Sequence, residues 1–220
     1  MATPRDPLAL AGWRRTVAEL YAAVRSEAEP GQAWEEWRAV RDRLFKDHPQ
    51  SPLARQERTR FDGLPYFPYD PTWRVGGTVE ADVERERFSA DLGPDGEFHF
   101  RRVGRVRFVA AGQEAALCLY WIEGYGGGLF LPFRDATNGD LTYGGGRYLY
   151  DTIKGADLGA GVGPDTLILD FNFAYNPSCA YDDRWVCPLP LPENRLAFAV
   201  QAGEQWPVSE KRLGGEGKKL

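Results

Sequence analysis

The chain has 220 residues, which fits one globular domain, with or without a helical appendage. Its formal net charge is −5 and its basic residues are interspersed with acidic ones, so we expect no nucleic-acid partner. We also expect no membrane association and a cytoplasmic location. No apolar run approaches transmembrane length, and residues 1–15 lack the apolar core of a signal peptide.

Helical periodicity is confined to the first sixty residues. Asp6-Pro7 is typical of a helix start, and apolar residues then recur at helical spacing over residues 10–24. A second amphipathic pattern covers residues 34–44, and a short third helix is expected over residues 52–60. Short amphipathic helices need an apolar partner, so we favour helices that cover one face or end of a sheet over a separate helical module.

Strand-like runs alternate with Gly- and Pro-rich turns in the rest of the chain, and no helical pattern intervenes, so the sheet should be mostly antiparallel. The sequence predicts an α+β fold with N-terminal helices packed on a mostly antiparallel β-barrel or β-sandwich. We expect a helical segment over residues 1–60, a β-rich domain over 61–205 and a disordered tail over 206–220. The expected strands cover residues 73–81, 84–91, 97–102, 105–110, 115–122, 129–133, 148–153, 166–173 and 196–201.

The three cysteines differ in their surroundings. Cys118 lies in an apolar run and should be buried as a small hydrophobic side chain. Cys179 and Cys187 are eight residues apart, which fits a disulfide that closes a short loop or two reduced, structural thiols close enough to interact. The two histidines are distant in sequence, so the pattern does not favour a zinc site, and we expect no metal and no cofactor.

Polar residue types gather between residues 129 and 192, beside glycine runs and strand ends. Asp135 is typical of a turn, or of an acid–base group at the rim of a pocket. Arg147 follows three glycines, so it could bind an anion or pair with a nearby aspartate such as Asp135, Asp151 or Asp170. We predict Asp135, Asp170 and Glu193 as catalytic candidates, and Thr142, Tyr143, Arg147, Asn172, Tyr175 and Asn176 as ligand-binding candidates.

Three classes of function remain open for these residues. If they converge, Arg147 could bind a small acidic ligand and Asp135 or Asp170 could act as acid–base group, with hydrolysis as the reaction class. A non-enzymatic binder would use a pocket lined by Tyr143, Tyr148, Tyr175 and Trp185. A scaffold would instead hold partners through the segment PLPLP at residues 188–192 and through exposed helices. A buried polar network without a cavity would indicate a structural role.

Three blocks of this region also carry a family resemblance. The strings PFRDATNGDLTYGGGRY, LDFNFAYNPSCAY and CPLPLPENRL, together with the upstream RFDGL and YFP, resemble the bacterial domain-of-unknown-function family 1684 in order and spacing. The resemblance extends from about the second helix to Glu204. It implies a helical N-terminus and a β-rich body, and it implies no established activity.

Overall fold

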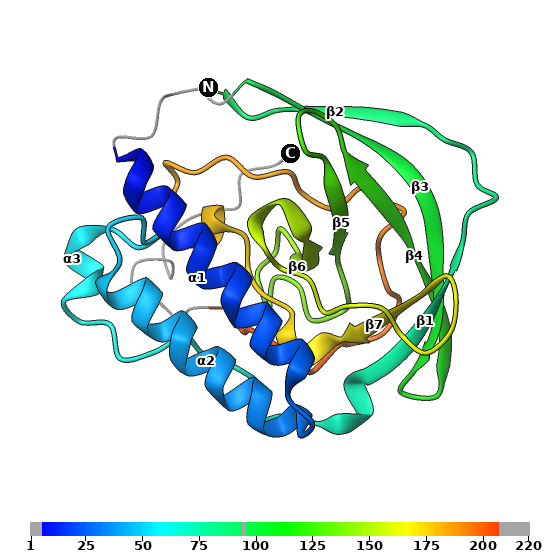
Figure 1. Cartoon of the computed structure of the whole chain (residues 1–220), viewed down its shortest axis with the longest axis horizontal. Coiled ribbons are helices and arrows are strands. Elements are labelled where there is room, and N and C mark those ends of the chain that lie inside the picture. Colours follow the sequence, from blue (N-terminus) through cyan, green and yellow to red (C-terminus); the bar gives the residue numbers. More distant parts are fainter. Residues whose placement is uncertain (1–5, 94–95, 207–220) are drawn as a thin grey trace.

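In the computed structural model, which describes residues 6–93 and 96–206, two long helices lie side by side along one flank of a curled sheet (Figure 1). Helix α1 (Pro7–Ser26) begins as predicted, with the Asp6 side chain accepting the N–H of Ala9 at 2.9 Å. Helix α2 (Pro30–Asp47) also starts with proline at its first position. No helix in these residues is both long and apolar enough to cross a membrane.

Helix α3 (Arg55–Arg58) is shorter than the helix predicted over residues 52–60. The hydroxyl of Ser51 donates to the Phe45 carbonyl at 2.5 Å and accepts the N–H of Leu53 at 3.2 Å. Ser51 therefore forms a turn against the end of α2 and does not cap a helix, so the chain becomes helical only from Arg55.

Within the described residues, seven strands form one antiparallel sheet, which curls into a half-barrel (Figure 1). The sheet order is β6-β5-β4-β3-β1-β7, and β2 pairs with β3. This confirms the α+β class and the mostly antiparallel, barrel-like sheet. The strands are β1 (Arg74–Glu80), β2 (Arg87–Asp91), β3 (Glu97–Ala110), β4 (Gln113–Ile122), β5 (Gly128–Phe133), β6 (Arg147–Asp151) and β7 (Thr166–Asp170).

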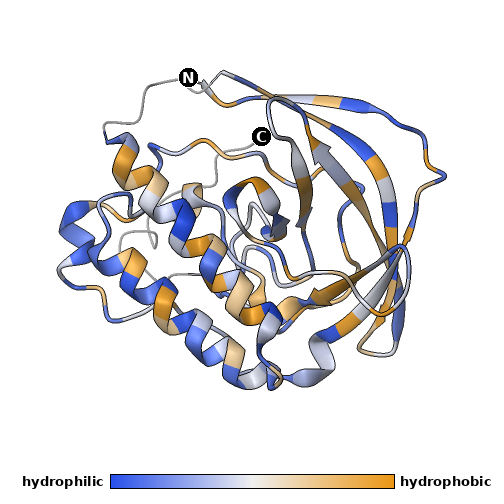
Figure 2. Ribbon diagram, in the orientation of Figure 1, coloured by the Kyte–Doolittle hydropathy of each residue, from blue (hydrophilic) through white to orange (hydrophobic). Residues whose placement is uncertain are grey.

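A β-bulge joins the two strands expected over residues 97–102 and 105–110 into the single strand β3. The pairing of β3 with β4 shifts by one residue between Arg102 and Gly104. A Cβ at Gly104 would lie 2.9 Å from Val79 Cγ1, so the bulge requires glycine at this position. Hydrophobic and hydrophilic residues alternate along β3 (Figure 2), and the shift changes which residues face each side of the sheet.

Both faces of the sheet are covered. One face packs with α1 and α2 in the main core, where Tyr21, Trp34 and Trp37 belong to the same buried cluster as sheet residues such as Leu131 and Leu169. The helices therefore cover the sheet and share its core, as the favoured interpretation predicted. The opposite face carries a smaller aromatic cluster under residues 188–194, made of Phe100, Cys118, Tyr120, Ile122, Phe130 and Tyr148.

Several predicted strands are shorter in the structure and one is absent; the strands expected over residues 84–91 and 148–153 begin at Arg87 and end at Asp151, respectively. The strand expected over residues 166–173 ends at Asp170, and Phe171–Phe173 forms the 3₁₀ turn η4, in which the Asp170 side chain accepts the N–H of Asn172. Residues 196–201 do not form a strand, although their pattern is apolar. They cross the end of β5 and make single backbone bonds to Arg134 and Ala136. Of the tail predicted over residues 206–220, only Trp206 belongs to the described residues.

Candidate functional site

The three carboxylates predicted as catalytic candidates lie in three separate hydrogen-bond networks, each with its own arginine. Two of the three carboxylates are completely buried, and the third is partly open to solvent. Direct contacts therefore bring the predicted site residues together only in part. The carboxylate–arginine pairs are Asp135–Arg147 at 2.8 Å, Asp170–Arg74 at 3.0 Å and Glu193–Arg102 at 2.6 Å.

Arg147 begins β6 and points into the protein interior. Its Nη2 donates to Asp135 Oδ2 at 2.8 Å and to the Val200 carbonyl at 3.0 Å, and its Nη1 donates to the Ala202 carbonyl. Burial lowers the pKa of the Arg147 guanidinium, and the charge of Asp135 opposes this shift. The pairing of Arg147 with an aspartate is confirmed. The pair ties the loop between β5 and β6 to residues 200–202, so the guanidinium is already neutralised by a protein carboxylate.

Thr142 and Tyr143 belong to the same loop. The side-chain amide of Asn138 donates to Thr142 Oγ1 and to the Tyr143 carbonyl, both at 2.9 Å, which closes the loop as a turn. The glycines that follow allow close packing: Gly146 has φ +92°, and a Cβ there would lie 2.7 Å from the Phe133 carbonyl oxygen. The close backbone approach is therefore to β5.

Asp170 and Asn172 fix the start of the sheet to its last strand. Asp170 accepts from Arg74 at 3.0 Å, and the Asn172 amide bonds both the N–H and the carbonyl of Asp70 at 3.0 and 2.9 Å. Burial raises the pKa of Asp170, although Asn172 and Arg74 oppose the shift. These hydrogen bonds join Asp70, Arg74, Asp170 and Asn172, so the arrangement anchors the connector before β1.

Glu193 anchors residues 187–194, which lie over the aromatic face of the sheet. It accepts from Arg102 at 2.6 Å and from the Tyr120 hydroxyl at 2.6 Å. Burial raises the pKa of Glu193, but the hydrogen bonds from Arg102 and Tyr120 outweigh this effect, so the pKa is lowered overall. The next residue, Asn194, bonds both backbone groups of Cys118 across the sheet, and Cys118 is buried as predicted.

Glu204 is not among the site residues predicted from the sequence, and its carboxylate is completely buried. It pairs with Arg41 of α2 at 2.7 Å, accepts the N–H of Asn176 at 3.0 Å and accepts the Tyr181 hydroxyl. Burial raises the pKa of Glu204 to about 7, against the opposing charge of Arg41. Arg41 also lies 5.2 Å from the ring centroid of Tyr175. The available signal was Arg41 itself, a charged residue on the apolar stripe of a helix, which needs a buried partner.

The chain is similar to a protein family and to a protein of solved structure. The family model DUF1684, described as a protein of unknown function, matches residues 59–205. The chain belongs to this family. It is also similar to a solution NMR structure of an uncharacterized protein from gene locus rrnAC0354 of Haloarcula marismortui. The two share 36% sequence identity with a TM-score of 0.57, over 79% of this chain and 95% of that chain. No curated protein matches the chain.

Cys179 and Cys187 both lie within the residues matched by DUF1684, and the structure brings them together. The backbone N–H of Cys179 lies 3.4 Å from Cys187 Sγ, which confirms that the two residues are close. Both are free thiols and partly exposed. Residues 188–192 do not extend freely from the molecule, because Pro188 and Pro190 are buried and the Tyr148 hydroxyl donates to the Pro188 carbonyl.

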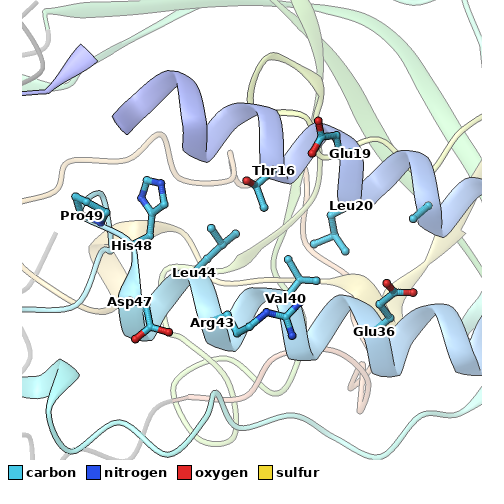
Figure 3. Close-up of a pocket in the computed structure, with 11 residues that line it drawn as sticks. Thr16, Glu19, Leu20, Glu36, Val40, Arg43, Leu44, Asp47, His48 and Pro49 are labelled. Carbon is cyan, nitrogen blue, oxygen red and sulfur yellow. The ribbon is translucent and has the colours of Figure 1, made fainter. Parts of the chain in front are cut away.

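A groove on the outer side of the helices precedes the DUF1684 match in the chain. It has a volume of about 510 Å³ and runs between α1 and α2 (Figure 3). Apolar side chains form its floor, and charged side chains line its edges. Its main lining residues are Thr16, Glu19, Leu20 and Ala23 from α1, and Glu36, Val40, Arg43, Leu44, Asp47 and His48 from α2 and its C-terminal end.

Proposed function

We propose that this protein is an interaction protein that holds a basic, amphipathic helix of a partner protein in the groove between α1 and α2. The observation that carries the proposal is the groove itself, with Leu20, Val40 and Leu44 along its floor (Figure 3). An apolar groove bordered by helices is a recurrent docking site for the apolar face of another helix. The proposal corresponds to the scaffold class with exposed helices.

The charge of the groove favours a basic partner. Glu19, Glu36 and Asp47 contribute three carboxylates, and Arg43 contributes one guanidinium. Burial and the nearby charge of Arg58 lower the pKa of His48, so this imidazole is neutral at neutral pH and adds no positive charge. Two negative charges remain in excess around the apolar floor, which complements lysine and arginine residues beside the apolar face of a bound helix.

The length of the groove sets the length of the partner segment. On α2 its lining runs from Glu36 to Asp47. At 1.5 Å per residue this stretch spans about 16 Å, or roughly three helical turns. A partner helix of three to four turns could therefore place apolar residues along the floor and basic residues opposite the acidic edges.

Two other functions have less support from the same contacts. Hydrolysis of a small acidic molecule would need Asp135 or Asp170 to take up and release a proton. Each of these carboxylates is buried and paired with an arginine. An acidic small-molecule ligand would need a free cation, and Arg147 is paired in the interior. A cytoplasmic location is part of our proposal and rests on the composition of the chain.

A direct test uses a synthetic peptide of about three to four turns with leucine at helical spacing on one face and lysine on the other. We expect isothermal titration calorimetry at low salt to show saturable binding to the full chain. The double variant Glu19→Lys/Glu36→Lys should weaken binding about tenfold or more, because like charges would then meet across the groove. Circular dichroism would verify that the variant is folded.

The neighbouring residue Glu35 provides the matched control. It lies on α2, is exposed, and pairs with Arg38 at 3.7 Å outside the groove. Glu35→Lys should leave peptide binding unchanged within about twofold. Equal binding by the double variant and the unmodified chain would contradict the proposal. Dimerisation of the chain that the double variant abolishes would identify a second copy as the occupant instead.

A further inference from the structure

Cys179 and Cys187 form a pair of interacting thiols, independent of the helical groove. Besides the contact between Cys179 N–H and Cys187 Sγ at 3.4 Å, the Tyr143 hydroxyl lies 3.6 Å from Cys179 Sγ. Both cysteines are partly exposed. In contrast, Cys118 is buried beneath Asn194 and is only 2% exposed.

The environment distinguishes the two sulfur atoms chemically. A hydrogen bond from the Cys179 thiol lowers the pKa of Cys187 to about 7, and the charge of Lys154 and the N–H groups of Ser178 and Cys179 act in the same direction against burial. The same hydrogen bond, together with burial, raises the pKa of Cys179. The N–H of Cys179, which donates to Cys187 Sγ at 3.4 Å, favours the same assignment, with Cys187 as the more acidic thiol of the pair.

Lys154 is held near the pair by the turn after β6. The 3₁₀ turn η3 (Thr152–Lys154) starts at Asp151, whose carboxylate lies 3.4 Å from Lys154 Nζ. The lysine side chain is 59% exposed. Asp151 raises the pKa of Lys154 and keeps the amine charged.

The loop between the cysteines is anchored on both sides of Cys187. Arg184 Nη2 donates to the Ser51 carbonyl at 3.1 Å, and Trp185 Nε1 donates to the Pro52 carbonyl at 3.2 Å. On the other side, the Tyr148 hydroxyl donates to the Pro188 carbonyl. The loop therefore holds Cys187 against Cys179. No group of three or more metal-ligating residues occurs in the described part of the chain, so the pair is not one half of a recognisable zinc site.

We propose that Cys187 and Cys179 form a thiol–disulfide exchange site for low-molecular-weight disulfides, with Cys187 as nucleophile and Cys179 as resolving thiol. The Cys187 thiolate attacks one sulfur of R–S–S–R, the S–S bond breaks, and one RS⁻ leaves. Cys179 then loses its proton and attacks Cys187 Sγ, which releases the second RS⁻. The protein dithiol is oxidised by two electrons to a disulfide, and the small disulfide is reduced to RSH and RS⁻, because the Cys179 proton passes to one of the two released thiolates.

The test is incubation of the reduced full chain with oxidised glutathione at pH 7, followed by acid quenching and peptide mapping by mass spectrometry. We expect an internal Cys179–Cys187 disulfide and no product at Cys118. Cys179→Ser should stop at a mixed disulfide on Cys187, and Cys187→Ser should react slowly or not at all. A chain that keeps both thiols free, or that carries glutathione on Cys179 first, would overturn the proposal.

A second measurement avoids reliance on the cysteine variants and tests the positioning role of Lys154. In the unmodified chain, Cys187 should be alkylated by iodoacetamide at pH 7 faster than a cysteine in a short unstructured peptide. Lys154→Met should slow alkylation about threefold to tenfold and move its pH midpoint upward, because the thiolate loses a nearby positive charge. Lys46→Met, on the exposed side of α2, is the control and should change neither. Alkylation of Cys187 no faster than the peptide, or equal effects of both lysine variants, would overturn the assignment.

Discussion

Asp135 and Glu193 are both carboxylates held by an arginine, yet their surroundings differ. The side chains of Asp135 and Arg147 are 0% exposed, and their other hydrogen bonds go to the N–H and hydroxyl of Thr137 and to the backbone of residues 200–204. Glu193 and Arg102 are 31% and 13% exposed, and they lie at the edge of the segment that covers the aromatic face. One pair is sealed in the interior, and the other can exchange hydrogen bonds with water.

The difference in exposure shows that the same residue types, a carboxylate and an arginine, can have different roles. A buried charge has lost its hydration, so removing its partner leaves an uncompensated charge in the interior. A partly exposed charge recovers much of that energy from water. The residue types of Asp135 and Arg147 are those of catalytic and ligand-binding sites. In the structure the two side chains are buried together, and their ion pair connects two segments of the chain. The predictions below test this contrast, starting with the largest effect.

Arg147→Met should have the largest effect. Methionine approximates the length of the side chain but leaves Asp135 buried without its cation, so we expect a loss of about 3–5 kcal/mol in the free energy of unfolding. Urea unfolding followed by tryptophan fluorescence measures it. The control is Arg107→Met, because Arg107 is 59% exposed and pairs with Glu80 on the surface. A loss of less than about 1 kcal/mol for Arg147→Met would contradict the structural role.

Glu204 extends the comparison to pH. Its pKa is raised from 4.5 to about 7 in the folded chain, mainly by burial. Between these pH values the unfolded state has lost a proton that the folded state retains. The contribution of Glu204 to stability should therefore be greatest below about pH 4.5, fall as the pH rises to about 7, and level off above it, with a total change of about 3 kcal/mol.

The measurement is the difference in unfolding free energy between the unmodified chain and Glu204→Gln from pH 4 to pH 8. Glutamine cannot ionise, so subtracting its curve removes the contribution of Asp170 and other groups that titrate in both proteins. The difference should change across the window from about pH 4.5 to 7. A difference that is constant with pH would show that Glu204 has the same pKa in the folded and unfolded chains, which would contradict the raised pKa.

Local patterns made much of the fold predictable. Helical spacing and the Asp6-Pro7 start identified α1, and strand-like runs between Gly- and Pro-rich turns located the strands to within a few residues at each end. Burial of Cys118 followed from the apolar run around it. The pattern failed for residues 196–201, whose backbone is used to hold the loop after β5 and not to extend the sheet.

The candidate site was less predictable because its partners are far apart in the chain. Glu204 and Arg41 are 163 positions apart, and no local pattern connects them. Lys154 lies in a turn that carries no recognisable motif, and only the fold brings it near Cys187. The density of polar residues in the sequence does not show which of them are buried, and burial decides which can react and which hold the chain together.

Glu193→Gln tests the partly exposed pair of Glu193 and Arg102, and it should cause the smallest loss in the free energy of unfolding. The glutamine oxygen can still accept from Tyr120, and Arg102 still has Glu86 at 3.3 Å and access to water. We therefore expect a loss of less than about 1 kcal/mol in unfolding free energy. This loss should shrink in about 1 M salt, because partly exposed charges are screened, whereas the loss caused by Arg147→Met should persist. A loss for Glu193→Gln as large as that for Arg147→Met would show that exposure does not separate the two pairs, and the contrast between them would fail.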